Sequence, residues 1–187
     1  MTEPSIILVA FALLFAFLNG FGDSASIVAT MISSRAMTAR RALLLSTVAH
    51  MVAPFLFGVA VAEAIGRGVV APGFATMSVV LSGVIGAIVW NVLTSILGIP
   101  SSSSHSLVGG LVGGAIAAQG LDSIHFPGLS RLVVVLLFSP PLGFLGGYLL
   151  MKLVLFLVRS ASPRINWFFK RMQLGTTLVL ALSRSTN

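Results

Sequence analysis

The 187-residue chain contains no cysteine and only four acidic residues. Without cysteine it has no disulfide bond, no thiolate metal site and no cysteine nucleophile. Charged residues make up only 8% of the chain, whereas soluble domains carry about a quarter, so this composition excludes a water-exposed globule. Hydrophobic residues make up 57% and the mean hydropathy is +1.07, which indicates a polytopic membrane protein.

The few charges that are present are mostly basic. Eleven Lys and Arg against four Asp and Glu give a formal net charge of +7. Such an excess is also found in nucleic-acid-binding proteins, but here the basic residues lie between apolar runs rather than on one polar face. Segments 35–41 and 152–171 are therefore predicted to be cytoplasmic, and segments 66–73 and 119–130 external. We expect a lipid bilayer as partner and no nucleic acid.

Apolar runs predict an all-α bundle, because a membrane-spanning helix needs about 20 mainly apolar residues. The runs cover 5–32, 42–65, 74–99 and 132–158, with a weaker Ser/Gly-rich segment at 101–118 and a sixth run from Leu174. The first run is expected to break near 19–24, and the fifth at Pro140–Pro141. About five crossings fit the loop charges, and an odd number fits an inverted repeat. The sequence leaves open whether residues 99–118 span the membrane or re-enter it.

Asp23 is the only carboxylate deep within an apolar run, where an ionisable group costs several kcal/mol and so becomes a functional candidate. Gly20 and Gly22 permit unusual backbone angles, which favours a helix break at this point. Unwound carbonyl groups with one carboxylate would coordinate a small cation, and the amides of the following half-helix would attract an anion. The alternative is that Asp23 only caps a helix or pairs with Arg35.

A second polar constellation follows Pro100, which resists continuation of the third apolar helix. It consists of Ser101, Ser102, Ser103 and Ser104. Four hydroxyl groups with free N–H groups make a neutral cradle suited to a tetrahedral oxyanion. The alternative is a polar loop before a helix that packs through two glycine pairs, Gly109/Gly113 and Gly110/Gly114.

Other polar residues carry weaker signals. Asn91 and Thr94 either line a pathway or form interhelical hydrogen bonds. The sequence contains no metal-ligand cluster, nucleotide-binding loop or catalytic triad, so no enzymatic activity and no cofactor are expected.

With both constellations in view, the chain resembles the inorganic phosphate transporter (PiT) family. The similarity runs through N-G-F-G-D-S-A-S-I-V-A-T at 19–30, S-R-A-M-T at 34–38, W-N at 90–91 and G-I-P-S-S-S-S-H at 98–105. The family pattern is approximately N-G-x-H-D-x-A-N-x-I-A-T, S-x-R-A-L-T, W-N and G-x-P-x-S-S-S-H. The resemblance implies a symporter that moves phosphate with sodium or protons, although some relatives move sulfate. It also implies two inverted repeats, each contributing a broken helix and a serine segment.

The resemblance also implies roles for individual residues. Asp23, Asn19 and Ser26 would serve the coupling ion, sodium or a proton. Thr30 and the four serines 101–104 would surround the phosphate. The expected location is the plasma membrane, as a multi-pass protein.

Departures from the family pattern qualify this interpretation. Gly22 stands where the pattern has His, and Ser26 where it has Asn. Near the carboxyl end, Arg184 and Ser185 replace a His–Gly pair, and the chain stops one residue before an expected Asp. Residues 1–171 are therefore predicted to form a first repeat and 172–187 the truncated start of a second. This predicts half a transporter: a fragment, or a chain that pairs with a partner or with itself. The alternatives are a non-transporting remnant or subunit, or a permease for sulfate or another oxyanion.

Overall fold

The computed structural model of the chain describes residues 3–33, 35, 37–57, 66, 68–99, 101–159 and 165–185. Over these residues the elements are helices, and the only β contact is an isolated bridge between Val70 and Ile124. The elements are α1 (Glu3–Ser33), α2 (Ala39–Phe57), α4 (Met77–Ile96), α5 (Ser103–Gln119), the short 3₁₀ helix η1 (Leu121–Ser123), α6 (Phe126–Val158) and α7 (Ile165–Ser185). The predicted all-α membrane bundle is confirmed.

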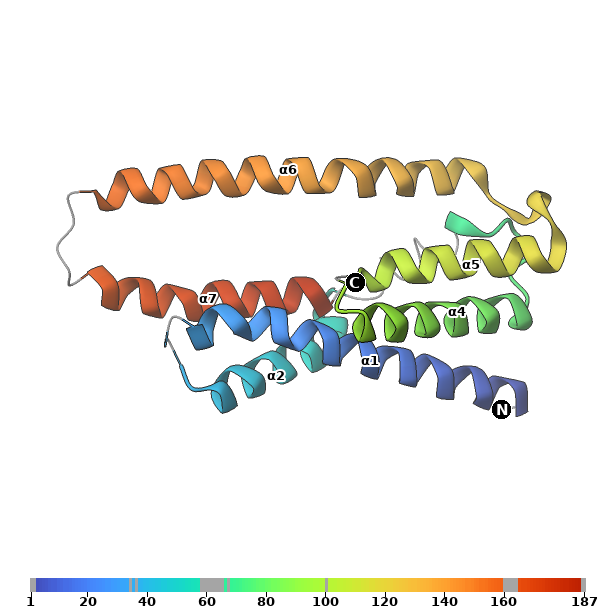
Figure 1. The fold of residues 1–187 in the computed structure, drawn as a ribbon, viewed down its shortest axis with the longest axis horizontal. Coiled ribbons are helices and arrows are strands. Elements are labelled where there is room, and N and C mark those ends of the chain that lie inside the picture. The colour runs from blue at the N-terminus through green and yellow to red at the C-terminus, as the bar shows by residue number, and fades with distance from the viewer. Residues whose placement is uncertain are drawn as a thin grey trace.

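Two long helices set the length of the molecule. α1 and α6 have 31 and 33 residues, which corresponds to about 45–50 Å each at 1.5 Å per residue. Figure 1 shows both running along the long axis, with the shorter helices between and beside them. Among the described residues, three helices are long and apolar enough to span a membrane: α1 through Ser5–Gly22, α4 and α6. The chain is an integral membrane protein.

The helices α4 and α5 form a hairpin that reaches the middle of α1. Figure 1 shows α1 and α4 starting at the same end of the molecule, with α5 returning beside α4. The last turns of α4 share a cavity with residues 18–22, near the middle of α1. The tip of the hairpin therefore lies beside the centre of α1.

Glycine packing holds the two arms of the hairpin together. A Cβ added at Gly110 would clash with the backbone of Gly83 on α4, and one added at Gly114 would meet the side chain of Ser82. At Gly109 and Gly113 a Cβ would meet nothing within 4 Å. Of the two glycine pairs that the sequence predicts to pack, the Gly110/Gly114 pair therefore faces α4 and the other does not.

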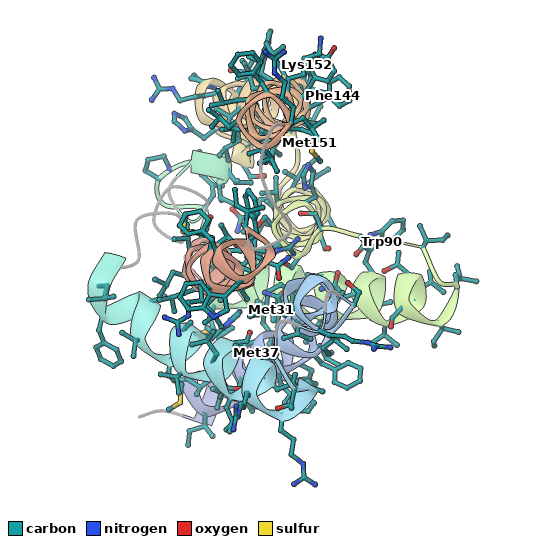
Figure 2. All side chains as sticks on the ribbon, turned by 90° about the vertical axis from the view of Figure 1, so that its left-hand side faces the viewer. Met31, Met37, Trp90, Phe144, Met151 and Lys152 are labelled. Carbon is teal, nitrogen blue, oxygen red and sulfur yellow. The ribbon has the colours of Figure 1, made fainter. Side chains whose placement is uncertain are left out.

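A second core forms where α1, α2 and α7 pack together. Met31 is fully buried there with Val28 of α1, Ala42 and Ala49 of α2, and Ala181 of α7. Figure 2 shows Met31 and Met37 between these three helices. The small alanines allow close approach of the helix backbones, which is typical of membrane helix packing. This core places the end of α7 against the middle of the bundle.

By contrast, α6 buries none of its residues within the chain. Phe144, Met151 and Lys152 project from it in different directions in Figure 2, and Phe144 is 76% exposed. Only its first turns are anchored, through Leu129 and Leu132, which pack against the hairpin core. Beyond these turns, the uncovered apolar surface of α6 is suited to contact lipid or further helices.

Two helix breaks predicted from the sequence are absent. α1 continues through residues 19–24, because Gly20 and Gly22 allow unusual backbone angles but do not require them. α6 continues through Pro140–Pro141. Pro140 cannot donate to the Leu136 carbonyl oxygen, but the Ser139 hydroxyl donates to that oxygen at 3.2 Å. α7 also begins earlier than predicted, at Ile165 rather than near Leu174.

The loops that were predicted to be external lie together. Ala71 N–H donates to the Ser123 carbonyl oxygen at 2.8 Å, and His125 N–H donates to Val69 at 3.0 Å, on either side of the Val70–Ile124 bridge. These contacts join the chain before α4 to the chain before α6. The arrangement agrees with the prediction that segments 66–73 and 119–130 share one side of the membrane.

Candidate functional site

A cavity of about 550 Å³ lies where the hairpin tip meets the middle of α1 and the end of α7. Figure 1 shows the end of α7 approaching the connection between α4 and α5. Its polar side chains come from α1 (Asn19), the hairpin (Asn91, Thr94, Ser95, Ser101, Ser103) and α7 (Arg184). Gly22 and apolar side chains complete the lining. Four helices, distant in sequence, thus converge near the middle of α1 on one cavity that has both polar and apolar walls.

Asn91 organises the hairpin tip. Its Oδ1 accepts hydrogen bonds from the Ser106 hydroxyl at 2.7 Å and from the Ser101 hydroxyl at 3.2 Å. The asparagine thereby ties the end of α4 to residues on both sides of the start of α5. Because its carbonyl oxygen accepts from two hydroxyl groups, the amide NH₂ is the group that can donate to a ligand in the cavity.

The start of α5 is open towards the same cavity. Ser102 has extended backbone angles and caps the helix, and its Oγ accepts from His105 N–H at 3.5 Å. The first turn of a helix leaves N–H groups without intrahelical acceptors, here at Ser103 and Ser104. The positive end of the helix dipole lies at the same place. Ser103 lines the cavity, so its surroundings favour an anion.

A second cavity, of about 680 Å³, lies on another face of the hairpin. Its lining includes Trp90, His105, Ser102 and the glycines of both arms. Ser101, Thr94 and Ile99 line both cavities, so the two cavities adjoin at the hairpin tip.

The predicted site residues divide into three groups. Asn19, Ser101 and Ser103 line the first cavity, Ser101 and Ser102 line the second, and Ser104 lines neither. The structure therefore brings Asn19 together with part of the serine segment. The side chains of Asp23, Ser26 and Thr30 lie outside the described residues, so their roles stay predictions.

Two residues contribute more than the sequence suggested. Asn91 was predicted to line a pathway or to form interhelical hydrogen bonds; it lines the cavity and accepts such a bond from Ser106 of α5, and its further bond to Ser101 places it on both flanks of the serine segment. Its place within the W-N motif was the available signal. Arg184 was noted only as a departure from the family pattern, yet it lines the cavity. No local pattern reveals this contact, because it depends on how α7 packs.

Comparison with known proteins agrees with these motifs. A "probable low-affinity inorganic phosphate transporter" of Rhizobium meliloti (strain 1021) is 38% identical over 96% of this chain and 54% of its own length. A protein of the same description from Streptomyces halstedii is 41% identical over 85% of this chain and 75% of its own length. One from Mycobacterium tuberculosis (strain CDC 1551 / Oshkosh) is 40% identical, and this chain covers 44% of it. The chain thus spans about half the length of several curated relatives.

The fold is also similar to a solved structure described as the sodium-dependent phosphate transporter. The TM-score is 0.77 at 22% identity, over 98% of this chain and 55% of the solved one. The sequence profile of the phosphate transporter family matches residues 19–186, from the first polar motif of α1 to just beyond Arg184. The resemblance drawn from the two motifs is confirmed: the chain belongs to the phosphate transporter family.

Proposed function

We propose that the chain takes part in secondary transport of inorganic phosphate across the plasma membrane, as a symporter coupled to sodium or protons. The membership of a transporter family already confirms that it is not an enzyme. The observation that carries the proposal is the cavity near the middle of α1, which combines Asn19, Ser101, Ser103 and Arg184. Substrate sites of secondary transporters typically lie where a discontinuous helix meets its neighbours, and the interruption between α4 and α5 lies at this cavity beside a continuous α1.

The proposed phosphate position is at the start of α5. There the hydroxyl of Ser103, the N–H groups of the first turn and the amide of Asn91 supply donors. Neutral donors attract an oxyanion less strongly than a cluster of arginines would. The phosphate can therefore leave the site again. The coupling ion is proposed to bind near Asn19 and Asp23 on α1, next to the phosphate. Because the two ions carry opposite charges, the binding of each lowers the electrostatic free energy that the binding of the other costs.

Uptake of labelled phosphate into proteoliposomes that contain the complete assembly tests the proposal, with either a sodium or a proton gradient imposed. We expect Ser103→Ala to weaken phosphate binding by roughly tenfold or more, because a hydrogen bond to a charged group contributes about 1.5–3 kcal/mol. Ser130→Ala is the matched control: Ser130 is exposed at the start of α6 and its hydroxyl bonds only the Pro127 carbonyl oxygen. Equal effects of the two substitutions would contradict the proposed phosphate position.

The coupling role has a separate test. Asp23→Asn keeps the size of the side chain but removes its charge, so we expect gradient-driven uptake to be abolished. Unchanged uptake under both gradients would refute the role of Asp23. Competition by sulfate against labelled phosphate distinguishes a phosphate transporter from a permease for another oxyanion.

A further set of helices belongs to this proposal. The chain spans about half of several relatives, and α6 buries none of its own residues. We infer that a second repeat, a partner chain or a second copy covers part of α6 and completes the transport pathway. The alternative, a non-transporting remnant or subunit, is favoured by Gly22 and Ser26 at family motif positions. Such a chain would bind phosphate in detergent without moving it into vesicles, alone or with a partner.

A further inference from the structure

Basic and aromatic side chains alternate along one face of the last turns of α6. Phe144 stacks on Tyr148 with the ring centroids 6.4 Å apart, and Lys152 Nζ lies 4.9 Å from the Tyr148 ring centroid. One turn beyond Lys152, the Arg159 guanidinium lies 4.8 Å from the centroid of the Phe156 ring. Helical spacing places these residues on one side of α6, and all of them are exposed. Figure 2 shows Lys152 on the side of α6 that faces away from the other helices.

The charges along α6 are spaced by the thickness of a bilayer. Arg131 and Lys152 enclose residues 132–151, which carry no charge. At 1.5 Å per residue this stretch is about 30 Å long, which matches the hydrocarbon core of a membrane. Lys152 therefore lies at one boundary of the core, on the side predicted to be cytoplasmic. The next two turns of α6, up to Arg159, then lie at the depth of the lipid headgroups.

The start of α7 carries the same combination of side chains. Figure 1 shows the end of α6 and the start of α7 at the same end of the molecule, where residues 160–164 join them in sequence. Trp167 and Phe168 are exposed there, and the Arg171 guanidinium lies 3.9 Å from the Trp167 ring centroid. Tryptophan with basic residues is typical of the membrane–water interface. Two helices thus present cations beside exposed aromatic rings at one level.

The chain supplies no carboxylate to this end of α6 and α7. Residues 126–187 contain no Asp or Glu. In the part of the chain that the structure describes, Lys152, Arg159 and Arg171 contact aromatic rings and form no ion pair. A charge at the boundary of the hydrocarbon core is costly unless it has a counter-charge. Anionic lipids of the cytoplasmic leaflet supply that counter-charge at this depth.

We propose that the end of α6 and the start of α7 form a binding site for the headgroup of an anionic phospholipid of the cytoplasmic leaflet. Lys152, Arg159 and Arg171 attract the headgroup, and the exposed aromatic rings contact the glycerol backbone and the upper acyl chains. The inference does not depend on the phosphate cavity, which lies near the middle of α1. If these basic residues only oriented the chain in the membrane, they would show no preference among phospholipids.

Fluorescence quenching by brominated lipids tests the proposal at Trp167. The chain contains two tryptophans, so a Trp90→Phe background leaves Trp167 as the reporter. The purified full chain is placed in bilayers that contain brominated phosphatidylglycerol, which is anionic, or brominated phosphatidylcholine, which is zwitterionic. We expect the anionic lipid to bind next to Trp167 about fivefold more tightly, or better. The double variant Lys152→Gln/Arg159→Gln should lower this ratio towards one.

Matched variants separate the site from general attraction to a basic protein. Arg131→Gln removes an exposed charge at the other end of α6 and should leave the ratio unchanged. Lys152→Arg/Arg159→Lys keeps both charges and should keep the preference. Circular dichroism verifies that the helices persist in each variant.

Four results would overturn the proposal. The first is equal quenching of Trp167 by the two lipids in the chain with its native basic residues. The second is an effect of Arg131→Gln as large as that of the double variant. The third is protection of Trp167 from both lipids, which would mean that another helix covers this end. The fourth is loss of the preference when inorganic phosphate replaces chloride at equal ionic strength, which would mean that the cations hold free phosphate instead of a lipid.

Discussion

The contact between Gly110 and Gly83 makes the hairpin sensitive to a single methyl group. A Cβ at Gly110 would clash with the Gly83 carbonyl group and lie 3.3 Å from the Ala87 backbone nitrogen. These are backbone atoms, so the two helices must separate, and overpacking of this kind costs about 1–3 kcal/mol. The higher helix propensity of alanine also stabilises the helix by up to about 1 kcal/mol relative to glycine. Gly110→Ala should therefore be neutral to destabilising by about 2 kcal/mol.

Gly113→Ala is the matched substitution on the same helix. A Cβ there meets nothing within 4 Å, so only the gain in helix propensity, up to about 1 kcal/mol, applies. The two variants should differ by about 1–3 kcal/mol, or several degrees in melting temperature. Thermal unfolding of the purified protein in detergent, followed by tryptophan fluorescence, measures this difference; Trp90 lies on α4 and reports on the hairpin. Equal shifts for both variants would refute the close packing of α4 and α5.

Three further substitutions test other parts of the fold. Asn91→Ala removes the acceptor of the Ser101 hydroxyl and one of two acceptors within reach of the Ser106 hydroxyl, the other being the Ser102 carbonyl oxygen, and should destabilise the chain by about 1–3 kcal/mol in the same unfolding assay. Ser139→Ala leaves the Leu136 carbonyl oxygen without its hydroxyl donor, so amide hydrogen exchange should quicken in the turns of α6 around the prolines. Met31→Ala empties a fully buried position and should cost about 2–5 kcal/mol, whereas Met151→Ala, 61% exposed on α6, should cost little.

Each of these predictions has a contrary outcome. An Asn91→Ala variant as stable as the unchanged chain would mean that the serine hydroxyls find other acceptors. Unchanged exchange around Pro140 would mean that Ser139 does not compensate for the missing N–H group. Equal destabilisation by the two methionine substitutions would contradict the division between a packed core of α1, α2 and α7 and an uncovered α6.

Periodicity and composition were sufficient to predict the main helices. Long apolar runs dominate secondary structure in a membrane protein, because every backbone group must be paired within its own segment. The same principle explains the two wrong predictions. At residues 19–24 and at Pro140–Pro141, continuing the helix leaves fewer unpaired backbone groups than breaking it does, and Ser139 pairs one that proline frees.

The candidate site was predicted only in part. Serines 101–104 were predicted from residue chemistry and Asn19 from the family resemblance; Asn19 and serines 101–103 line the cavities, and Ser104 does not. Arg184 could not be assigned in this way, since its position depends on the packing of α7 against α1 and α2. Which glycine pair faces α4 also depends on the rotation of α5 about its axis, and a four-residue glycine spacing cannot specify that rotation.

The bridge between Val70 and Ile124 has a mechanical consequence for the hairpin. It fastens the chain entering α4 to the chain leaving η1, so both arms are held at the same end. The arms then form a lever with its fulcrum at that end and its tip, the serine segment, beside α1. α4 is 20 residues long, about 30 Å, so a rotation of about 5° would move the tip by roughly 3 Å. That displacement equals the length of one hydrogen bond, so it would separate Ser103 from the oxyanion that we propose to bind there.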